Sequence, residues 1–414
     1  MRATSLGARP SLLFLCHTLP YPPDSGVKIR TYNILRLLAR EFAVSVLCFQ
    51  RGGERRSAAS GVQSLQDLLG LARAEAFPIA QEHSWVRLFT DHAQSLARRR
   101  AYTIWTYASR QYRSCIDRLL AAGEVDLVHM DSLDLAGYLP MLCGVPVVCT
   151  HHNVESQLLR RRAFREDSRW LQMYMRWQAA WVEDLERYWA KRVALNVVVS
   201  DADRGELARL APGANIGVVP NGVDIDNFRP VSGPTEGIVF AGGFDWFPNR
   251  DALEYFSSEI LPRIRATGNA APVRWVGRSS DTERRYYGAR HGIDLTGYVD
   301  DIRPYVTSAA CYVVPLRVGG GTRLKILEAW AMGKAVVSTS AGCEGLEAVD
   351  GENILVRDDP SAFAQAVCDV LADTELRSRL GRAARVTVER RYSWEVIAAE
   401  LNRLYRPLVR SSRG

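Results

Sequence analysis

The stretch VGGGTRLKILEAWAMGKAVVST, residues 318 to 339, brings chemically useful side chains close together. A run of glycines precedes two cations, Arg323 and Lys325, and a carboxylate, Glu328. Glycines let a ligand approach the backbone, and the N–H groups at the start of a helix attract phosphate oxygens. Two cations beside the positive end of a helix are unfavourable unless an anion compensates them. The grouping therefore predicts a nucleoside diphosphate site, with Glu328 accepting hydrogen bonds from a ribose diol. The alternative is a glycine-rich turn with solvated charges.

The elements that position these residues are short apolar runs alternating with helical patterns. A first series contains SLLFLCH, AVSVLCF, VDLVHM and VPVVCT, and a second restarts after residue 215 with NIGVVPNGVD, GIVFAGGF, VRWVGR and ACYVVPL. This alternation is typical of parallel sheets covered by helices on both faces. We therefore predict an α/β protein with two doubly wound domains, residues 1–208 and 209–392, joined near ARLAPGANIG. Because ligands bind beyond the carboxyl ends of parallel strands, residues that follow strands in both domains are the candidates for a cleft.

Bulk properties narrow the function classes. The chain has 414 residues, a formal net charge of +7 and eight cysteines without a C-x-x-C pair. Its length favours two domains, the mild positive charge suits anionic partners or has no consequence, and the cysteines suggest free thiols rather than disulfides or a zinc site. No apolar run reaches the ~18 to 20 residues of a membrane span, and LLFLC is too short for a signal peptide. We expect a cytosolic protein that can touch a membrane.

The opening stretch, together with VVPNGVD at 218–224 and GGFDWFPNRDAL at 242–253, resembles the retaining group 1 (family 4) glycosyltransferases. More narrowly, the chain is similar to sugar transferases of bacterial exopolysaccharide and PEP-CTERM/exosortase systems. LCHTLPYPPDSGVKIRTYNILRLLA and HHNVES match as well, so the resemblance covers nearly the whole chain. It implies the GT-B fold, two Rossmann-like domains facing each other across a cleft, with a C-terminal helix (393–414) that crosses back to the first domain.

The resemblance also assigns roles on the donor side. The family signature is a Glu, seven residues and a second Glu; Glu328 fills the second position and would bind the donor ribose. Gly320 occupies the first position, and Gly243 replaces the usual Arg at an earlier strand end. We hypothesise that Arg323 and Lys325 replace the lost charge on the diphosphate. Three residues would donate backbone N–H groups to that diphosphate, and two would contact the nucleobase: Gly320, Gly321 and Thr322, and Tyr298 and Val299.

On the acceptor side, PPDSGVKIR follows the first strand. Asp24 and Gly26 form a turn ahead of a helix, with Lys28 in its first turn. In the family such a glycine loop lies near the donor diphosphate and the acceptor. The alternative is an ordinary strand–helix turn stiffened by prolines.

Two adjacent histidines end the run VPVVCTHHNVES. Adjacent rings diverge, which is poor spacing for one metal ion, whereas an imidazole can orient a hydroxyl or donate to a developing charge. By the resemblance, His152 takes the place of the family's active-site histidine. His151 is expected to be structural, and Glu155 to cap or begin the next helix.

The segment SRWLQMYMRWQAAWVEDLERYW carries aromatic residues at helical steps of three and four. Such a stripe usually packs into a core. The alternative is an exposed amphipathic surface for a lipid-linked acceptor, with LRRRAFR at 159–165 and ARRRAY at 97–102 meeting anionic head groups.

The predicted function is transfer of a hexosyl group from a nucleotide diphosphate sugar to an acceptor hydroxyl, with retention at the anomeric carbon. We expect no cofactor and no metal, because the D-A-D of VVVSDAD is better explained as a helix N-terminus capped by Ser200. The expected partners are the donor and a glycan or lipid-linked acceptor, with peripheral contact to an anionic membrane and no nucleic acid. The expected setting is exopolysaccharide or other cell-surface glycan synthesis, at the inner face of the cytoplasmic membrane.

Other functions remain open on the sequence alone. The same fold hosts sugar-nucleotide 2-epimerases, which need no acceptor, and glycogen-type phosphorylases, which need pyridoxal phosphate. The missing first Glu of the motif leaves room for a non-catalytic nucleotide-sugar-binding protein. A nicotinamide dehydrogenase is least favoured, because neither FAGGFDW nor GGGTRLK gives G-x-G-x-x-G after a strand.

Overall fold

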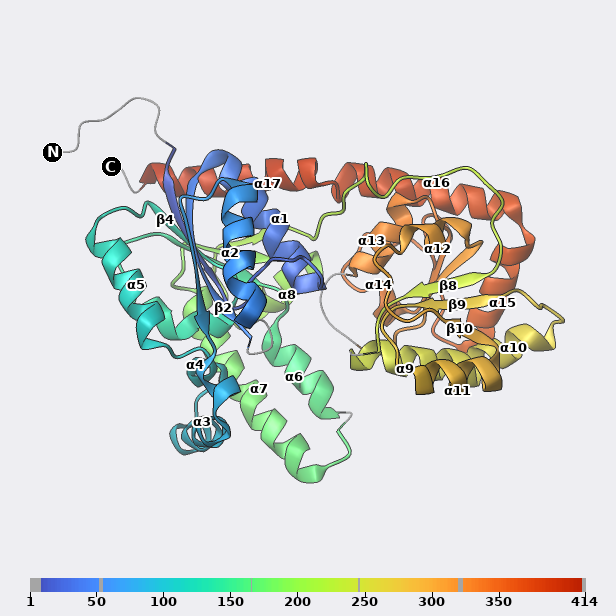
Figure 1. Cartoon of the computed structure of the whole chain (residues 1–414), viewed down its shortest axis with the longest axis horizontal. Helices are drawn as coiled ribbons and strands as arrows, with labels where there is room; N and C mark the ends of the chain where they lie inside the picture. Colours follow the sequence, from blue (N-terminus) through green and yellow to red (C-terminus); the bar gives the residue numbers. More distant parts are fainter. Residues whose placement is uncertain (1–8, 52–54, 165, 245, 319–322, 412–414) are drawn as a thin grey trace. The chain divides into compact units, whose positions relative to one another are not determined.

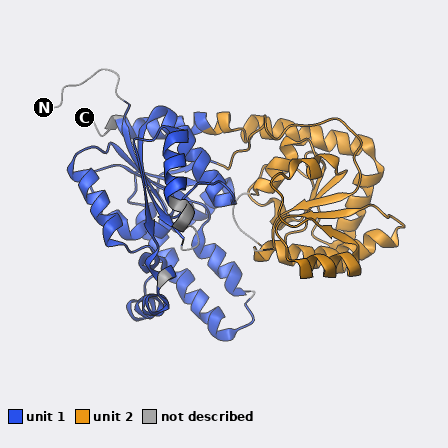
Figure 2. Cartoon of the chain, in the orientation of Figure 1, with its two compact units in different colours: residues 1–219, 398–414 blue, residues 220–397 orange. Residues whose placement is uncertain are grey.

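The chain folds into two α/β units, each with its own parallel sheet (Figure 2). The computed structural model describes residues 9–51, 55–164, 166–244, 246–318 and 323–411. Unit 1 consists of residues 1–219 and 398–414, and unit 2 of residues 220–397. Gly320, Gly321 and Thr322, which were predicted to contact the diphosphate, lie outside the described residues.

Unit 1 is built on a seven-stranded parallel sheet of order β3-β2-β1-β4-β5-β6-β7. Its central strands are almost entirely buried, because helices cover both faces of the sheet, and this accounts for their continuous apolar sequences (Figure 1). The strands are β1 (Ser11–Cys16), β2 (Ala43–Gln50), β3 (Arg73–Pro78), β4 (Leu127–Met130), β5 (Val147–His151), β6 (Leu195–Val198) and β7 (Ile216–Val218). The helices are α1 (Gly26–Glu41), α2 (Arg55–Leu69), α3 (Trp85–Arg98), α4 (Thr103–Thr106), α5 (Arg110–Ala121), α6 (Glu155–Phe164), α7 (Arg169–Ala190) and α8 (Asp201–Leu210), with 3-10 turns at Ala80–His83 and Leu133–Met141.

Unit 2 repeats this plan with a six-stranded parallel sheet of order β10-β9-β8-β11-β12-β13. Its strands are β8 (Ile238–Ala241), β9 (Val273–Val276), β10 (Ile293–Leu295), β11 (Cys311–Val314), β12 (Val336–Ser338) and β13 (Leu355–Val356). Its helices are α9 (Phe247–Tyr255), a π-helical segment (Phe256–Ile260), α10 (Leu261–Ala266), α11 (Asp281–His291), α12 (Arg303–Ser308), α13 (Leu324–Ala331), α14 (Ser340–Cys343), α15 (Pro360–Ala372) and α16 (Thr374–Arg391). The predicted fold class, two Rossmann-like parallel-sheet domains, is confirmed.

The division between the units differs from the predicted boundary at residue 208. The segment NIGVV forms β7, which pairs in parallel with β6, so it closes the first sheet instead of opening the second. The second unit begins at Pro220. An apolar tripeptide carries no mark of the sheet that it will join, and this is why the sequence placed the restart too early.

The last helix, α17 (Trp394–Ser411), belongs to both units, since the chain rejoins unit 1 from Ala398 onward. Tyr405 is fully buried in unit 1, where its hydroxyl lies 2.6 Å from His129 Nδ1. Residues 398–414 thus belong to the first compact unit, to which the sequence analysis assigned the C-terminal helix.

The aromatic stripe on α7 is only partly covered. Tyr174, Trp181 and Leu185 are half-buried, but Trp170, Trp177 and Tyr188 are exposed, with 79% of Trp170 accessible. The prediction that the stripe packs into the core is wrong for the exposed three. The fully buried positions of α7 are instead small or polar, because this face packs against α6, where Ser156 Oγ donates to Glu186 Oε2 at 2.5 Å.

Further predictions agree with the structure. SLLFLC forms β1, Ser200 caps α8 by accepting from the backbone N–H of Asp203, and all eight cysteines are free thiols. Across the described part of the chain, no helix is both long enough and apolar enough to cross a bilayer.

Candidate functional site

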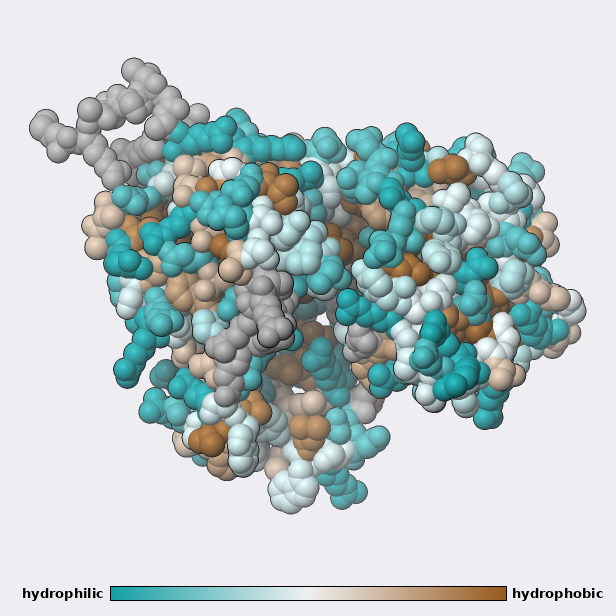
Figure 3. Space-filling view, viewed as in Figure 1, coloured by the Kyte–Doolittle hydropathy of each residue, from teal (hydrophilic) through white to brown (hydrophobic). Residues whose placement is uncertain are grey.

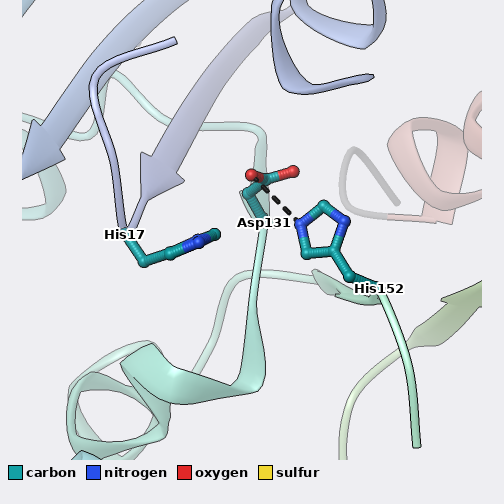
Figure 4. A group of neighbouring side chains, drawn as sticks. All are labelled: His17, Asp131 and His152. Atoms are coloured by element: carbon teal, nitrogen blue, oxygen red, sulfur yellow. Dashed lines mark ion pairs between the residues drawn. The ribbon is translucent and has the colours of Figure 1, made fainter. Parts of the chain in front are cut away.

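Three polar side chains meet at the carboxyl ends of adjacent strands in unit 1 (Figure 4). His17 follows β1, Asp131 follows β4 and His152 follows β5, and β4 pairs with both of the other strands. Their nitrogen and oxygen atoms all lie within 4.8 Å of one another. His152 Nε2 is 3.5 Å from Asp131 Oδ2, and the ring centroids of His17 and His152 are 5.8 Å apart. Parallel strands bring their carboxyl ends to one edge of the sheet, where such folds bind ligands.

Asp131 is held as a carboxylate although it is only 1% exposed. Burial alone would raise the pKa of Asp131, but the charge of His152 and a hydrogen bond from His129 outweigh it, so the pKa lies well below its usual range. Thr31 Oγ1 donates to Asp131 Oδ2 at 2.7 Å, and His129 Nε2 lies 3.7 Å from Oδ1. The group therefore contains a fixed negative charge.

A second layer ties this carboxylate to the end of the chain. His129, on β4, stacks against Phe14 with ring centroids 4.2 Å apart, and its Nδ1 contacts the Tyr405 hydroxyl of α17. Thr150 Oγ1 lies 3.3 Å from His129 Nε2. The His129 ring is fixed on both sides, and it fixes Asp131 in turn.

Two imidazole nitrogens of the group lack a hydrogen bond, although one of them, His152 Nε2, forms the ion pair with Asp131. His17 Nδ1 and His152 Nε2 are buried atoms with no hydrogen-bond partner among the residues that the structure describes. Leaving a buried polar atom unpaired costs about 1 to 3 kcal/mol, so such atoms usually mark a place where a ligand or water binds. Burial lowers the pKa of His17, which favours its neutral form. Two imidazoles and a carboxylate can bind sugar hydroxyls, and the same donor set could hold a divalent cation.

Around the two histidines of HHNVES, the structure agrees with the sequence. His151 is buried in β5, and its Nε2 lies 3.0 Å from Asn196 Oδ1, so it is structural as predicted. Glu155 begins α6 and accepts from Asn153 at 3.1 Å; burial raises the pKa of Glu155 to about 6.

The turn before α1 forms as predicted, but its role remains a prediction. Helix α1 begins at Gly26, and Lys28 Nζ pairs with Asp24 Oδ1 at 3.4 Å. The α1 residue that contacts Asp131 is Thr31, about one turn further along.

Sequence reasoning missed His17 and Asp131. Each directly follows an apolar strand, in FLCH and HMD, which is the position where a parallel sheet presents its polar groups. The missed signal was therefore positional, and it could have been found by listing the first polar residue after every strand.

In unit 2, the two glycine motifs meet through Lys325. Its Nζ donates to Asn249 Oδ1 at 2.8 Å, and Asn249 Nδ2 donates to the Gly243 carbonyl at 2.8 Å. The Lys325 ammonium lies 4.1 Å from the centroid of the Phe240 ring on β8. Thus α13, α9 and the end of β8 are joined around one cation.

The pKa values of Lys325 and Glu328 are both shifted in the direction that favours the neutral side chain. Burial, reinforced by the charge of Arg323, lowers the pKa of Lys325 to about 7. Burial raises the pKa of Glu328 to about 7, and Lys325 only partly offsets this. An anion placed beside Lys325 would favour its protonated form, so the ammonium is suited to binding phosphate.

Arg323 contacts α14. Only 3% of this residue is exposed; its guanidinium donates to the Ala341 carbonyl at 2.8 Å and lies 3.9 Å from Glu344 Oε2. The side chain therefore braces α14. Arg323 is the N-cap residue of α13, and its predicted contact with a diphosphate stays a prediction.

The predicted nucleobase residues lie beside the Gly243 loop. Gly277 has φ +147°, and a Cβ there would come within 2.7 Å of the Gly242 carbonyl carbon, so only glycine lets β8 and β9 end this close together. Gly277 forms a bridge with Gly297. This bridge leads to Tyr298, which is 65% exposed, and to the half-buried Val299.

A cation that the sequence reasoning overlooked lies at the same place. The Arg278 guanidinium carbon is 5.1 Å from the centroid of the Tyr298 ring. Arg278 is the first polar residue after β9, separated from it by Gly277, so the positional signal that marks His17 and Asp131 in unit 1 would have identified it too.

Comparisons with known proteins agree with this arrangement. Residues 25–227 match the family model "Glycosyltransferase Family 4", and residues 235–373 match "Glycosyl transferases group 1". A phosphatidyl-myo-inositol mannosyltransferase of Mycolicibacterium smegmatis is 26% identical over 309 residues, covering 70% of this chain and 73% of that protein. A lipopolysaccharide core biosynthesis glycosyltransferase of Rhizobium meliloti is 34% identical over 117 residues, 27% of this chain and 33% of its own.

Solved structures share the fold at low sequence identity. A sucrose-phosphate synthase from Thermosynechococcus elongatus has a TM-score of 0.67 at 18% identity, covering 97% of this chain and all of its own. The HepE protein of Anabaena in complex with UDP has a TM-score of 0.66 at 14% identity, covering 96% and 100%. The fold, and the two family models that together extend over most of the sequence, show that the chain belongs to the group 1 (family 4) glycosyltransferases.

Proposed function

We propose that this glycosyltransferase moves a hexosyl group from a nucleotide diphosphate sugar to an acceptor hydroxyl, with retention at the anomeric carbon and without a metal. The observation that carries the proposal is the contrast in the charge at the two strand ends. Unit 1 offers a fixed carboxylate beside two imidazole nitrogens that lack a hydrogen bond, and unit 2 offers a half-buried lysine whose pKa is lowered to about 7. The first suits hydroxyl groups, and the second suits a phosphate.

The donor is assigned to unit 2. In the proposal, Lys325 opposes the negative charge that grows on the diphosphate as the bond to the anomeric carbon breaks. Asn249 fixes the ammonium, Glu328 accepts hydrogen bonds from the ribose, and Tyr298 contacts the base. The titles of the HepE structures name complexes with UDP and with UDP-glucose, which supports a nucleotide sugar as donor.

The acceptor is assigned to unit 1. His152, oriented by Asp131, and His17 would hydrogen-bond sugar hydroxyls at the reacting centre. The acceptor oxygen bonds to the anomeric carbon on the face from which the diphosphate leaves, and the hydroxyl proton passes to the departing diphosphate oxygen. The net products are the glycoside and the free nucleoside diphosphate.

A lipid-linked acceptor at the cytoplasmic face of the membrane is part of the proposal. The mycobacterial relatives are named for phosphatidyl-myo-inositol, a phospholipid acceptor, and a further relative is named for lipopolysaccharide core synthesis. We therefore place the reaction in exopolysaccharide or other cell-surface glycan synthesis.

A panel of nucleotide sugars, assayed by nucleotide release with and without a membrane extract as acceptor, tests the proposal. We expect release to depend on one donor and on the extract, to persist with EDTA, and to fail in His152→Ala but not in Lys191→Ala, a change at an exposed position. Conversion of the donor without acceptor would indicate an epimerase. Binding of nucleotide with no turnover of any donor would indicate a non-catalytic protein. Loss of turnover in EDTA that a divalent cation restores would indicate that the His17–Asp131–His152 group is a metal site.

A further inference from the structure

Helix α3 is inverted relative to an ordinary surface helix. A helix on a globular protein normally buries its apolar stripe and exposes its polar face. In α3 the fully buried residues are polar, Asp91 and Ser95, both 0% exposed. The outward face is apolar: Trp85 is 81% exposed, Phe89 71% and Val86 60%, followed by Leu88 and Leu96.

One contact between helices holds α3 in this orientation. Ser95 Oγ accepts from Gln178 Nε2 of α7 at 2.8 Å. Within α3, Arg87 Nε donates to Asp91 Oδ2 at 3.0 Å, so the buried carboxylate has a cationic partner on its own helix. Rotating the helix to hide its aromatic residues would break the bond between α3 and α7, so the protein keeps the apolar face in contact with solvent.

The neighbouring helices carry the same type of residue. His92 Nδ1 of α3 lies 2.6 Å from the Tyr174 hydroxyl of α7. Phe164 at the end of α6 is 82% exposed, and Trp170 at the start of α7 is 79% exposed. Figure 3 shows brown, apolar side chains on the part of unit 1 where Figure 1 places α3 and the α6–α7 pair. We call Trp85, Val86, Phe89, Leu96, Phe164 and Trp170 the aromatic surface.

Arginines flank the aromatic surface. Arg98 is the last residue of α3, Arg99 and Arg100 follow it, and all three are exposed, as are residues 160–162 on α6. Apolar side chains bordered by guanidinium groups complement a bilayer boundary, where acyl chains lie below a layer of anionic phosphates. A second copy of this chain could also cover the apolar residues. It would, however, bring the two sets of arginines together, and like charges in an interface are repulsive.

We propose that the aromatic surface docks this protein on an anionic bilayer, with α3 lying in the plane of the interface and its aromatic residues inserted among the acyl chains. The proposal gives the membrane contact of the proposed function a defined location and rests on that part of it. It requires neither a donor nor an acceptor, so it can be tested apart from the chemistry.

Flotation of the full chain with vesicles, in the absence of nucleotide, tests the surface. We expect binding to vesicles of phosphatidylcholine mixed with phosphatidylglycerol and little binding to phosphatidylcholine alone. Trp85→Ala/Phe89→Ala should lower the partition coefficient by at least about 10-fold, because two aromatic insertions are lost. Arg98→Gln/Arg100→Gln should lower it by about 5-fold for each charge. The matched controls are Tyr286→Ala and Arg382→Gln, exposed residues of unit 2, which should bind as the unchanged protein does.

Several results would overturn the proposal. One is equal vesicle binding by the unchanged protein and Trp85→Ala/Phe89→Ala, in samples whose melting curves agree. Another is absence of binding to either vesicle. If light scattering shows that this double change converts a dimer to a monomer without any effect on vesicles, the surface is an interface between copies.

The outcome is separable from that of the transferase proposal. Nucleotide release with a soluble acceptor should survive Trp85→Ala/Phe89→Ala. If the protein binds vesicles but turns over no donor, the membrane-docking proposal is supported and the transferase proposal is contradicted. If it turns over a donor but binds no vesicles, the transferase proposal is supported and the docking proposal is contradicted.

Discussion

The candidate sites of the two units differ in how burial affects their charged groups. In unit 1, Asp131 is buried and yet charged, because His152 and His129 outweigh the effect of burial and lower its pKa. In unit 2, Lys325 and Glu328 are half-buried and too weakly compensated by charges nearby, so desolvation moves both pKa values to about 7. The charges of the unit 1 site are thus balanced, and its remaining capacity is for hydrogen bonds to a neutral ligand. The unit 2 site has too little negative charge beside Lys325 among the described residues. In the proposed reaction, the acceptor hydroxyl would bind at the first kind of site and the diphosphate of the donor at the second.

The largest effect should come from removing the cation of unit 2. Lys325→Met leaves a developing diphosphate charge without its ammonium, and we expect kcat to fall by about 10²- to 10³-fold. Steady-state nucleotide release measures this, with Lys191→Met as the control. Stability should change little, since the half-buried ammonium is not a favourable element of the fold. An unchanged kcat would remove Lys325 from the mechanism.

In unit 1, Asp131→Asn should lower kcat by about 10²-fold, because the carboxylate that orients His152 is lost. The acceptor KM should rise more than the donor KM if unit 1 binds the acceptor. A larger rise in the donor KM would contradict the assignment of the acceptor to unit 1.

A substitution of Arg323 tests whether this residue serves stability or catalysis in unit 2. Arg323→Ala removes a buried charged hydrogen bond to the Ala341 carbonyl, which should cost about 1.5 to 3 kcal/mol in the free energy of unfolding. Urea denaturation measures the cost. Turnover per folded molecule should remain far closer to normal than in Lys325→Met, and a loss as large as that of Lys325→Met would indicate that Arg323 contacts the ligand.

The pH dependence of nucleotide binding should report both groups of unit 2. The pKa of Lys325 is lowered to about 7, so its charged form is lost as the pH rises through that value, and affinity for a nucleoside diphosphate should fall about 10-fold per unit above it. The pKa of Glu328 is raised to about 7, so the carboxylate that we propose binds the ribose becomes protonated as the pH falls through that value. Calorimetry should show an alkaline limb that Lys325→Arg flattens and an acidic limb that Glu328→Gln flattens. A flat profile in the unchanged protein would contradict both assignments.

The smallest effect should come from the second layer of unit 1. Tyr405→Phe removes the hydroxyl that contacts His129 Nδ1, and we expect about 1 kcal/mol of lost stability and a fall in kcat of about 5-fold. The change should mainly alter kcat, because Tyr405 reaches the ligand only through His129 and Asp131. A Trp394→Phe variant, altered in the part of α17 that belongs to unit 2, is the comparison for stability effects alone.

Much of the fold was readable from the sequence, because each buried strand is a short β-rich run between helices. Two sheets, the helix after TRLK and the return of the C-terminal helix were all predicted. The predicted domain boundary was too early, because β7 pairs with β6 of the first sheet. The sequence of a three-residue strand does not show which strand it will pair with. Which face of a helix is covered was equally hidden: the periodicity of α3 predicts an apolar stripe, but only the contacts of Asp91 and Ser95 show that the stripe faces outward.

The site was predicted in part. His152, Lys325 and Glu328 lie at strand or helix ends, as their motifs indicated, and their roles remain predictions. Asp131 was missed because its partners, Thr31 and His129, come from other segments of the chain. The contact of Arg323 with α14 could not be predicted, because the direction of an N-cap side chain depends on what the neighbouring helix offers, here the carbonyl of Ala341.

The position of Tyr405 has a consequence for biosynthesis. The residue that contacts His129 is translated after all of unit 2. Unit 1 therefore cannot complete its inner polar network until unit 2 has been translated, and a product that terminates within unit 2 lacks the hydroxyl that fixes the ring. Synthesis of unit 2 is in this way a condition for completing the polar network of unit 1.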